Sequence, residues 1–101
     1  APSVVNLPRA EKSALPPDSY IQISVQPENR LSIGVHGKNR TGMDDVADRS
    51  ALLQRLQALH DENPEYPVLI AGDRESKYED VILLISEAKK MGINRVGLAT
   101  K

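Results

Sequence analysis

The sequence predicts an α+β domain with a mixed sheet, in the chain order β-β-α-β-α-β, and two helices packed on one face. Two observations lead to this fold class. Two segments with alternating apolar residues lie in the first half of the chain, and a strand, helix and strand follow one another in the second half. Such a succession within about 33 residues is a βαβ unit, whose strands are parallel and whose crossover is right-handed.

Residues 1–18 differ in composition from the rest, because four of the seven prolines lie there. Proline fixes its own φ and favours extended geometry in the residue before it, so we expect a proline-rich linker ahead of a domain at residues 19–101. One patch in the linker is apolar enough to pair as a strand with a sheet edge. This patch consists of Val4, Val5, Asn6, Leu7 and Pro8.

Apolar and polar residues alternate over residues 20–26 and again over residues 31–35. This period of two is typical of strands with one buried face. Residues 27–30 are short enough to close an antiparallel hairpin between them. Asn29 is the residue that we expect to take the left-handed conformation in that turn.

Residues 36–48 contain glycines, an asparagine and three aspartates, which predicts a loop that ends at a helix start with Asp48 as the N-cap. The helix is expected to end at Asn63 and Pro64. Residues 68–71 form a short apolar run, which is typical of a central strand. Four leucines at helical spacing give the first helix its apolar face: Leu52, Leu53, Leu56 and Leu59.

Ser76 and Glu79 have the spacing of a capping box, so a second helix is predicted to begin there. Gly92 lies where a left-handed residue would end this helix, and residues 95–100 supply the last strand. The inward stripe of the second helix is expected to consist of Tyr78, Val81, Ile82, Ile85 and Ala88.

Charge and composition exclude several classes of function. Thirteen basic and fourteen acidic residues give a net charge of −1, which lacks the one-sided positive field that nucleic acid binding requires. The chain has no cysteine, so disulfide scaffolds, thiolate metal sites and thiol nucleophiles are excluded. Its residues are 40% hydrophobic and only 3% aromatic, so one small aliphatic core is expected.

The acidic residues and histidines do not predict a metal site or a catalytic site. Asp44, Asp45 and Asp48 lack the central glycine and the distal glutamate of a calcium loop, so capping and solvation explain them better. His36 and His60 are too far apart in the sequence for the spacing of a metal pair. We therefore expect no catalytic residues, no metal and no cofactor.

Three stretches together resemble the periplasmic domain of the ExbD/TolR family. The apolar strand at residues 68–73 ends in an Asp, a Tyr follows in the next helix, and a Gly closes that helix before a Val-Gly-Leu strand. Upstream, residues 4–10 resemble the Leu-Pro segment that follows the family's membrane helix. The glycine before the Asp departs from the family pattern. The family-motif positions are Asp73, Tyr78, Gly92 and Gly97.

The resemblance implies a protein that couples energy without catalysis. Such proteins have one membrane helix, which would precede this chain, and work with an ExbB- or TolQ-like membrane protein that uses the proton-motive force. Separately, the two alternating strands and the last strand at the chain terminus lead us to expect a homodimer, formed through a sheet edge or through the hydrophobic side of the last strand. A periplasmic domain passes that work to a TonB- or TolA-like protein, and TolR-type domains also bind peptidoglycan. The sequence thus predicts the periplasmic domain of a single-pass inner-membrane protein.

Two other classes of function remain open at the level of sequence. A ferredoxin-like regulatory domain that binds a small molecule would have similar strands and helices and would need a polar pocket. A small acyl or phosphoryl hydrolase would need a phosphate-binding loop, for which Arg40 beside Asn39 is the sole candidate.

Overall fold

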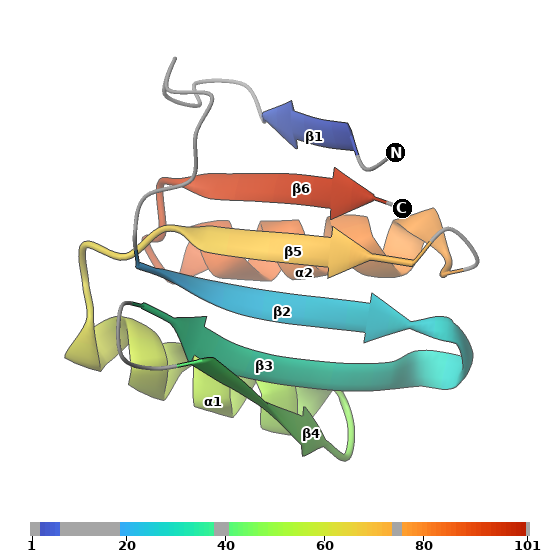
Figure 1. Ribbon diagram of the computed structural model, residues 1–101, viewed down its shortest axis with the longest axis horizontal. Coiled ribbons are helices and arrows are strands. Elements are labelled where there is room, and N and C mark those ends of the chain that lie inside the picture. The colour runs from blue at the N-terminus through green and yellow to red at the C-terminus, as the bar shows by residue number, and fades with distance from the viewer. Residues whose placement is uncertain (1–2, 7–18, 38–40, 74–75, 101) are drawn as a thin grey trace.

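The computed structural model describes residues 3–6, 19–37, 41–73 and 76–100 of the chain. They form a six-stranded mixed sheet in the order β1-β6-β5-β2-β3-β4, and both helices lie behind the same face (Figure 1). The elements are β1 (Ser3–Asn6), β2 (Tyr20–Gln26), the 3-10 turn η1 (Pro27–Asn29), β3 (Arg30–His36), β4 (Thr41–Val46), α1 (Arg49–Glu62), β5 (Val68–Gly72), α2 (Tyr78–Lys90) and β6 (Val96–Thr100).

The centre of the sheet confirms the predicted α+β class. Strands β2 and β3 form the antiparallel hairpin, with Ile21 opposite Val35 and Ile23 opposite Ile33. Strand β5 pairs in parallel with β2 on one side and with β6 on the other. The strand predicted to be central therefore is central, and β5, α2 and β6 form the expected βαβ unit.

Strand β4 corrects the prediction of a loop over residues 36–48. Residues 41–46 pair antiparallel with β3 along their whole length, with Leu31 opposite Val46. The sequence of β4 has no apolar alternation because β4 is an edge strand whose residues are mostly exposed. Backbone pairing with β3, rather than burial of side chains, holds it in the sheet.

The turn between β2 and β3 is also different from the prediction. The last pair of the hairpin is Gln26 with Arg30, which leaves the three residues of η1 for the turn. Pro27 fixes the first of them, and the middle one, Glu28, takes the left-handed conformation at φ 64°. Asn29, which was expected to do so, is not the residue with positive φ.

Helix α1 begins and ends where the sequence predicts. The Asp48 side chain accepts a hydrogen bond from the Ala51 backbone N–H at 2.8 Å, and Asn63 follows the last helical residue. Leu52, Leu56 and Leu59 are buried, and the helix packs on β3 and β4. Helix α2 packs on β5 and β6, so the two helices divide one face of the sheet between them.

The inward face of α2 differs from the predicted stripe. Tyr78 is 67% exposed and Ile82 is 38% exposed, so neither belongs to the core. Leu84, which the prediction left out, is buried. The row that covers the sheet is shifted around the helix axis from the predicted row, and it consists of Val81, Leu84, Ile85 and Ala88.

The two ends of α2 give one correction and one confirmation. The predicted capping box is wrong. Lys77 occupies the N-cap position and its side chain makes no capping hydrogen bond. The Ser76 hydroxyl instead donates a hydrogen bond to the Val25 carbonyl at 2.9 Å. Gly92 has φ 91° as predicted. Its N–H donates to the Lys89 carbonyl and the Ile93 N–H to the Ala88 carbonyl, which is a Schellman motif with Ile93 buried beside it.

Candidate functional site

One edge of the sheet is formed by a short strand from the N-terminal segment. Strand β1 pairs antiparallel with β6, from Ser3 opposite Thr100 to Asn6 opposite Gly97. Leu7 and Pro8 of the predicted pairing segment lie outside the described residues. Strand β1 is only four residues long. Its removal would expose the backbone N–H and C=O groups of β6, which could then pair with another strand.

The segment between β1 and β2 is long compared with the distance that it has to span. Residues 7–19 connect Asn6, at the start of β6, with Tyr20, and β6 and β5 lie between β1 and β2 in the sheet. Three strand spacings amount to about 14 Å, whereas thirteen extended residues reach roughly 43 Å. The connection therefore does not force β1 to stay on the edge.

The opposite edge of the sheet is the acidic strand β4. Asp44 pairs with Arg55 of α1 at 2.7 Å, and both side chains are about half exposed or more. Asp45 is the next residue along the strand and so points to the other face, while Asp48 caps α1. The three aspartates have separate positions, and the described part of the chain contains no group of three or more acidic or histidine residues that could hold a metal ion.

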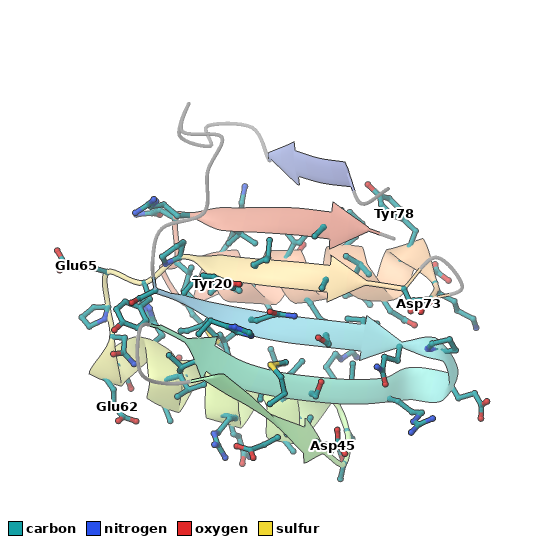
Figure 2. All side chains as sticks on the ribbon, in the orientation of Figure 1. Tyr20, Asp45, Glu62, Glu65, Asp73 and Tyr78 are labelled. Atoms are coloured by element: carbon teal, nitrogen blue, oxygen red, sulfur yellow. The ribbon has the colours of Figure 1, made fainter. Side chains whose placement is uncertain are left out.

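The face of the sheet away from the helices contains an aromatic pair that sequence reasoning missed. The rings of Tyr20 and His36 stack with centroids 5.0 Å apart and an interplanar angle of 3°. The hairpin register pairs these two residues directly, so counting outward from the turn would have found them. Figure 2 shows Tyr20 at the end of β2 where the strand begins.

The two histidines contain buried nitrogen atoms. His36 Nε2 and His60 Nδ1 have almost no solvent contact, and neither has a hydrogen-bond partner among the described residues. The His36 ring stacks on Tyr20, so its buried nitrogen lies beside an aromatic contact.

The loop between β5 and α2 is fastened to the end of β2. The Val25 carbonyl accepts hydrogen bonds from the Asp73 N–H at 3.0 Å and from the Ser76 hydroxyl at 2.9 Å. The Asp73 carbonyl in turn accepts from the Ser76 N–H. Asp73 thus occupies a structural corner where β5 leaves the sheet, and Ser76 holds that corner in place of capping α2.

The four family-motif positions do not form one cluster. Asp73 and Tyr78 lie at one end of α2 (Figure 2), and Gly92 lies beyond its other end, about 20 Å away for a helix of thirteen residues. Gly97 is inside β6, where an added Cβ would meet only Leu69 Cδ1 at 3.7 Å. Three of the positions serve turns or strands, and only Tyr78 presents a large side chain to solvent.

The described residues therefore offer backbone edges and exposed side chains for binding. None of the described helices has the length and apolar character needed to cross a membrane.

A family model described as "Biopolymer transport protein ExbD/TolR" matches residues 2–101, which is all of the chain but its first residue. No individually curated protein matches the sequence.

Proposed function

Because the chain belongs to the ExbD/TolR family of biopolymer transport proteins, we propose that it is the coupling domain of an energy transducer driven by the proton-motive force. The family is transport-associated and non-catalytic, and its members work with ExbB- or TolQ-like and TonB- or TolA-like partners. We assign the periplasmic domain to residues 19–101 and the membrane-proximal linker to residues 1–18. A TonB- or TolA-like protein is the partner to which this domain passes work.

The pairing of β1 with β6 is the observation that supports this proposal best. A four-residue strand from the linker occupies an edge of the sheet, and thirteen residues connect it to β2. An extended segment of a partner can form the same backbone hydrogen bonds once β1 leaves, with alternate side chains supplying specificity. In this proposal β1 and the partner strand compete for β6.

Competition has a quantitative consequence. A strand that belongs to the same chain as its sheet meets the edge at an effective concentration in the millimolar range, so it occupies that edge for much of the time. A ligand that needs the free edge has an apparent dissociation constant equal to its intrinsic dissociation constant divided by the fraction of molecules in which the edge is free. If β1 is docked about 90% of the time, its removal tightens partner binding about tenfold.

The test is the affinity of the chain for peptides from TonB- and TolA-like proteins, measured with and without residues 1–10. A second variant with Val4→Pro and Val5→Pro keeps the length of the chain but cannot form the backbone ladder. Both variants are expected to bind the peptide more tightly than the unaltered chain. Equal affinities for all three would contradict competition at this edge.

A proline on the other edge is the matched control. Asp45→Pro in β4 blocks the far side of the sheet and is expected to leave peptide affinity unchanged. Circular dichroism checks that each variant is folded. If Asp45→Pro abolishes binding while the β1 variants have no effect, the partner strand adds to β4 instead.

Peptidoglycan is the further ligand that the proposal includes. Sedimentation of the folded chain with purified peptidoglycan tests it, and a chain that stays in the supernatant removes this ligand from the proposal.

A ferredoxin-like regulatory domain is not favoured, because that fold has the order β-α-β-β-α-β. Here β2, β3 and β4 all precede α1.

A further inference from the structure

Helix α2 has two exposed apolar side chains beside the sheet edge that β1 occupies. Tyr78 is 67% exposed and Ile82 is 38% exposed, and both lie outside the buried row that covers the sheet. Figure 2 shows Tyr78 projecting from the start of α2 toward the side of the sheet where β1 lies. Ile82 follows one helical turn later, about 40° around the helix axis from Tyr78. Tyr78 and Ile82 therefore form one flank of α2, which faces the β1 edge.

A third exposed apolar side chain of α2 points elsewhere. Leu83 is 45% exposed, but it lies about 140° around the helix axis from Tyr78 and nearly opposite the buried Val81 and Ala88. Its side chain is therefore on the outer side of the helix, away from the sheet and from the β1 edge. Since Leu83 and Ile82 have the same size and are both exposed, Leu83 is a matched control for the flank.

Any strand that pairs with β6 places every second residue on the side of the sheet where α2 lies. Val96 and Leu98 of β6 are buried on that side, where α2 packs. Opposite residues of a ladder share a face, so the position that pairs with Leu98 belongs to the helix side, as do the positions two residues before and after it. In β1 the first two of these register positions are Ser3 and Val5. These are the positions of an added strand that lie next to the α2 flank.

The spacing of the flank matches an extended chain. Tyr78 and Ile82 are four residues apart on a helix that runs along β6 (Figure 1), which corresponds to a rise of about 6 Å. Alternate residues of a strand are about 6.8 Å apart. Two consecutive helix-side residues of an added strand can therefore each contact one residue of the flank while the backbone pairs with β6. A helix or a lipid surface could cover the flank but would leave the adjacent backbone edge unused.

We propose that the α2 flank selects which extended segment pairs with β6. This inference rests on the proposed coupling function, in which a partner strand and β1 compete for the edge. The segment that fits has large apolar side chains at two alternate positions, which contact Tyr78 and Ile82. The flank stays exposed although β1 occupies the edge. A partner with two such side chains therefore buries apolar surface that β1 leaves uncovered, which favours displacement of the tethered strand.

Serine substitutions in the full 101-residue chain test the selection. Tyr78→Ser and Ile82→Ser are each expected to weaken the binding of peptides from TonB- and TolA-like proteins about tenfold, measured by isothermal titration calorimetry. Leu83→Ser removes an apolar side chain of the same size from the outer side of α2 and is expected to leave the affinity unchanged. Because all three positions are exposed, the variants are expected to fold, and thermal unfolding checks this.

The register of β1 allows a second measurement that needs no peptide. Ser3→Leu places a large apolar side chain opposite Thr100, at the end of the edge where Tyr78 lies. It is expected to slow amide hydrogen exchange of the β6 amides that bond to β1 about tenfold, because the docked state is more populated. In a Tyr78→Ser background the same change is expected to have little effect. Asn6→Leu, opposite Gly97 on the other face of the sheet, is the control whose effect does not depend on Tyr78.

These measurements distinguish failure of the flank from failure of the coupling function. If the peptides compete with β1 but bind equally well to all three serine variants, the coupling function stands and selection by the flank is wrong. If no peptide binds, the coupling function fails, whereas an effect of Ser3→Leu that requires Tyr78 still supports the flank. An effect of Ser3→Leu that persists in the Tyr78→Ser background overturns the proposal.

Other occupants of the flank are further outcomes of the same variants. Equal weakening of peptide binding by Leu83→Ser would show that exposed apolar residues of α2 act without regard to the edge, and it would overturn selection. Binding of the full chain to phosphatidylcholine vesicles that is lost in Ile82→Ser, with unchanged peptide affinity, would assign the flank to a lipid surface instead.

Discussion

Gly34 and Gly97 show how differently two glycines of one sheet are constrained. A Cβ built on Gly34 would overlap the backbone carbonyl of Gly42 on the neighbouring strand, which cannot move without breaking the β3–β4 ladder. A Cβ on Gly97 meets only the end of the Leu69 side chain, at an ordinary contact distance. The close approach of two backbones therefore requires glycine at position 34 and not at position 97.

Gly34→Ala is expected to destabilise the domain by about 1–3 kcal/mol, because the neighbouring strand has to shift. Gly97→Ala, the matched control, is expected to change the free energy of unfolding by less than about 0.5 kcal/mol. Urea unfolding of both variants measures the difference. Equal destabilisation of the two variants would show that β4 is not held as closely to β3 as described.

His36 combines a favourable ring contact with a buried ring nitrogen. Its ring stacks on Tyr20, while Nε2 is buried without a hydrogen bond among the described residues. His36→Phe retains the stacked pair and removes the unsatisfied atom, so it is expected to stabilise the domain by about 1 kcal/mol. His36→Ala, which loses the stack as well, is expected to destabilise it. A lower melting temperature for His36→Phe would indicate that Nε2 has a partner.

At the scale of elements, different interactions stabilise the two ends of α2. Gly92→Ala places a side chain at φ 91° and is expected to destabilise the domain by about 1 kcal/mol. Ser76→Ala removes the hydroxyl bond to Val25 but leaves that carbonyl bonded to the Asp73 N–H, so about 0.5–1 kcal/mol is expected. Thermal unfolding measures both, and an unchanged curve for Gly92→Ala would exclude the left-handed helix end.

The elements that could be predicted from sequence are those with a local cause. Asp48 caps α1 and Gly92 ends α2 because side-chain capping and positive φ depend on neighbours in the chain. Strand β4 could not be predicted, because an exposed edge strand has no apolar pattern and exists through pairing with β3. Tyr78 and Ile82 were placed inside because they have helical spacing, although the tertiary packing selects a different row of the same helix.

The candidate site was predictable only in part for the same reason. An apolar patch in a proline-rich segment indicated a strand, but which edge receives residues 3–6 is decided by the position of β6 in the folded sheet. The apolar surface of α2 could not be separated from its core row by periodicity alone. Both features depend on where the sheet ends, which no local pattern contains.

For the whole molecule, the position of β1 at the rim predicts that it opens independently of the rest. Deletion of residues 1–6 is expected to leave cooperative unfolding intact, because β1 is a four-residue strand at the rim of the sheet and pairs with β6 alone. Amide hydrogen exchange should increase in β6 and stay unchanged in β5, which keeps both of its neighbours. Loss of cooperative unfolding in the truncated chain would contradict an independent β1.

Because β1 runs antiparallel to β6, the force needed to separate the two strands depends on the direction in which it is applied. Ser3 lies opposite Thr100, so the segments that precede β1 and follow β6 leave the sheet at the same end. Tension between these two segments would separate the β1–β6 ladder one residue pair at a time. Tension between the segment before β1 and a ligand held at the other end of the sheet would load all four pairs together in shear. The same strand is therefore easily released by one pull and resistant to the other.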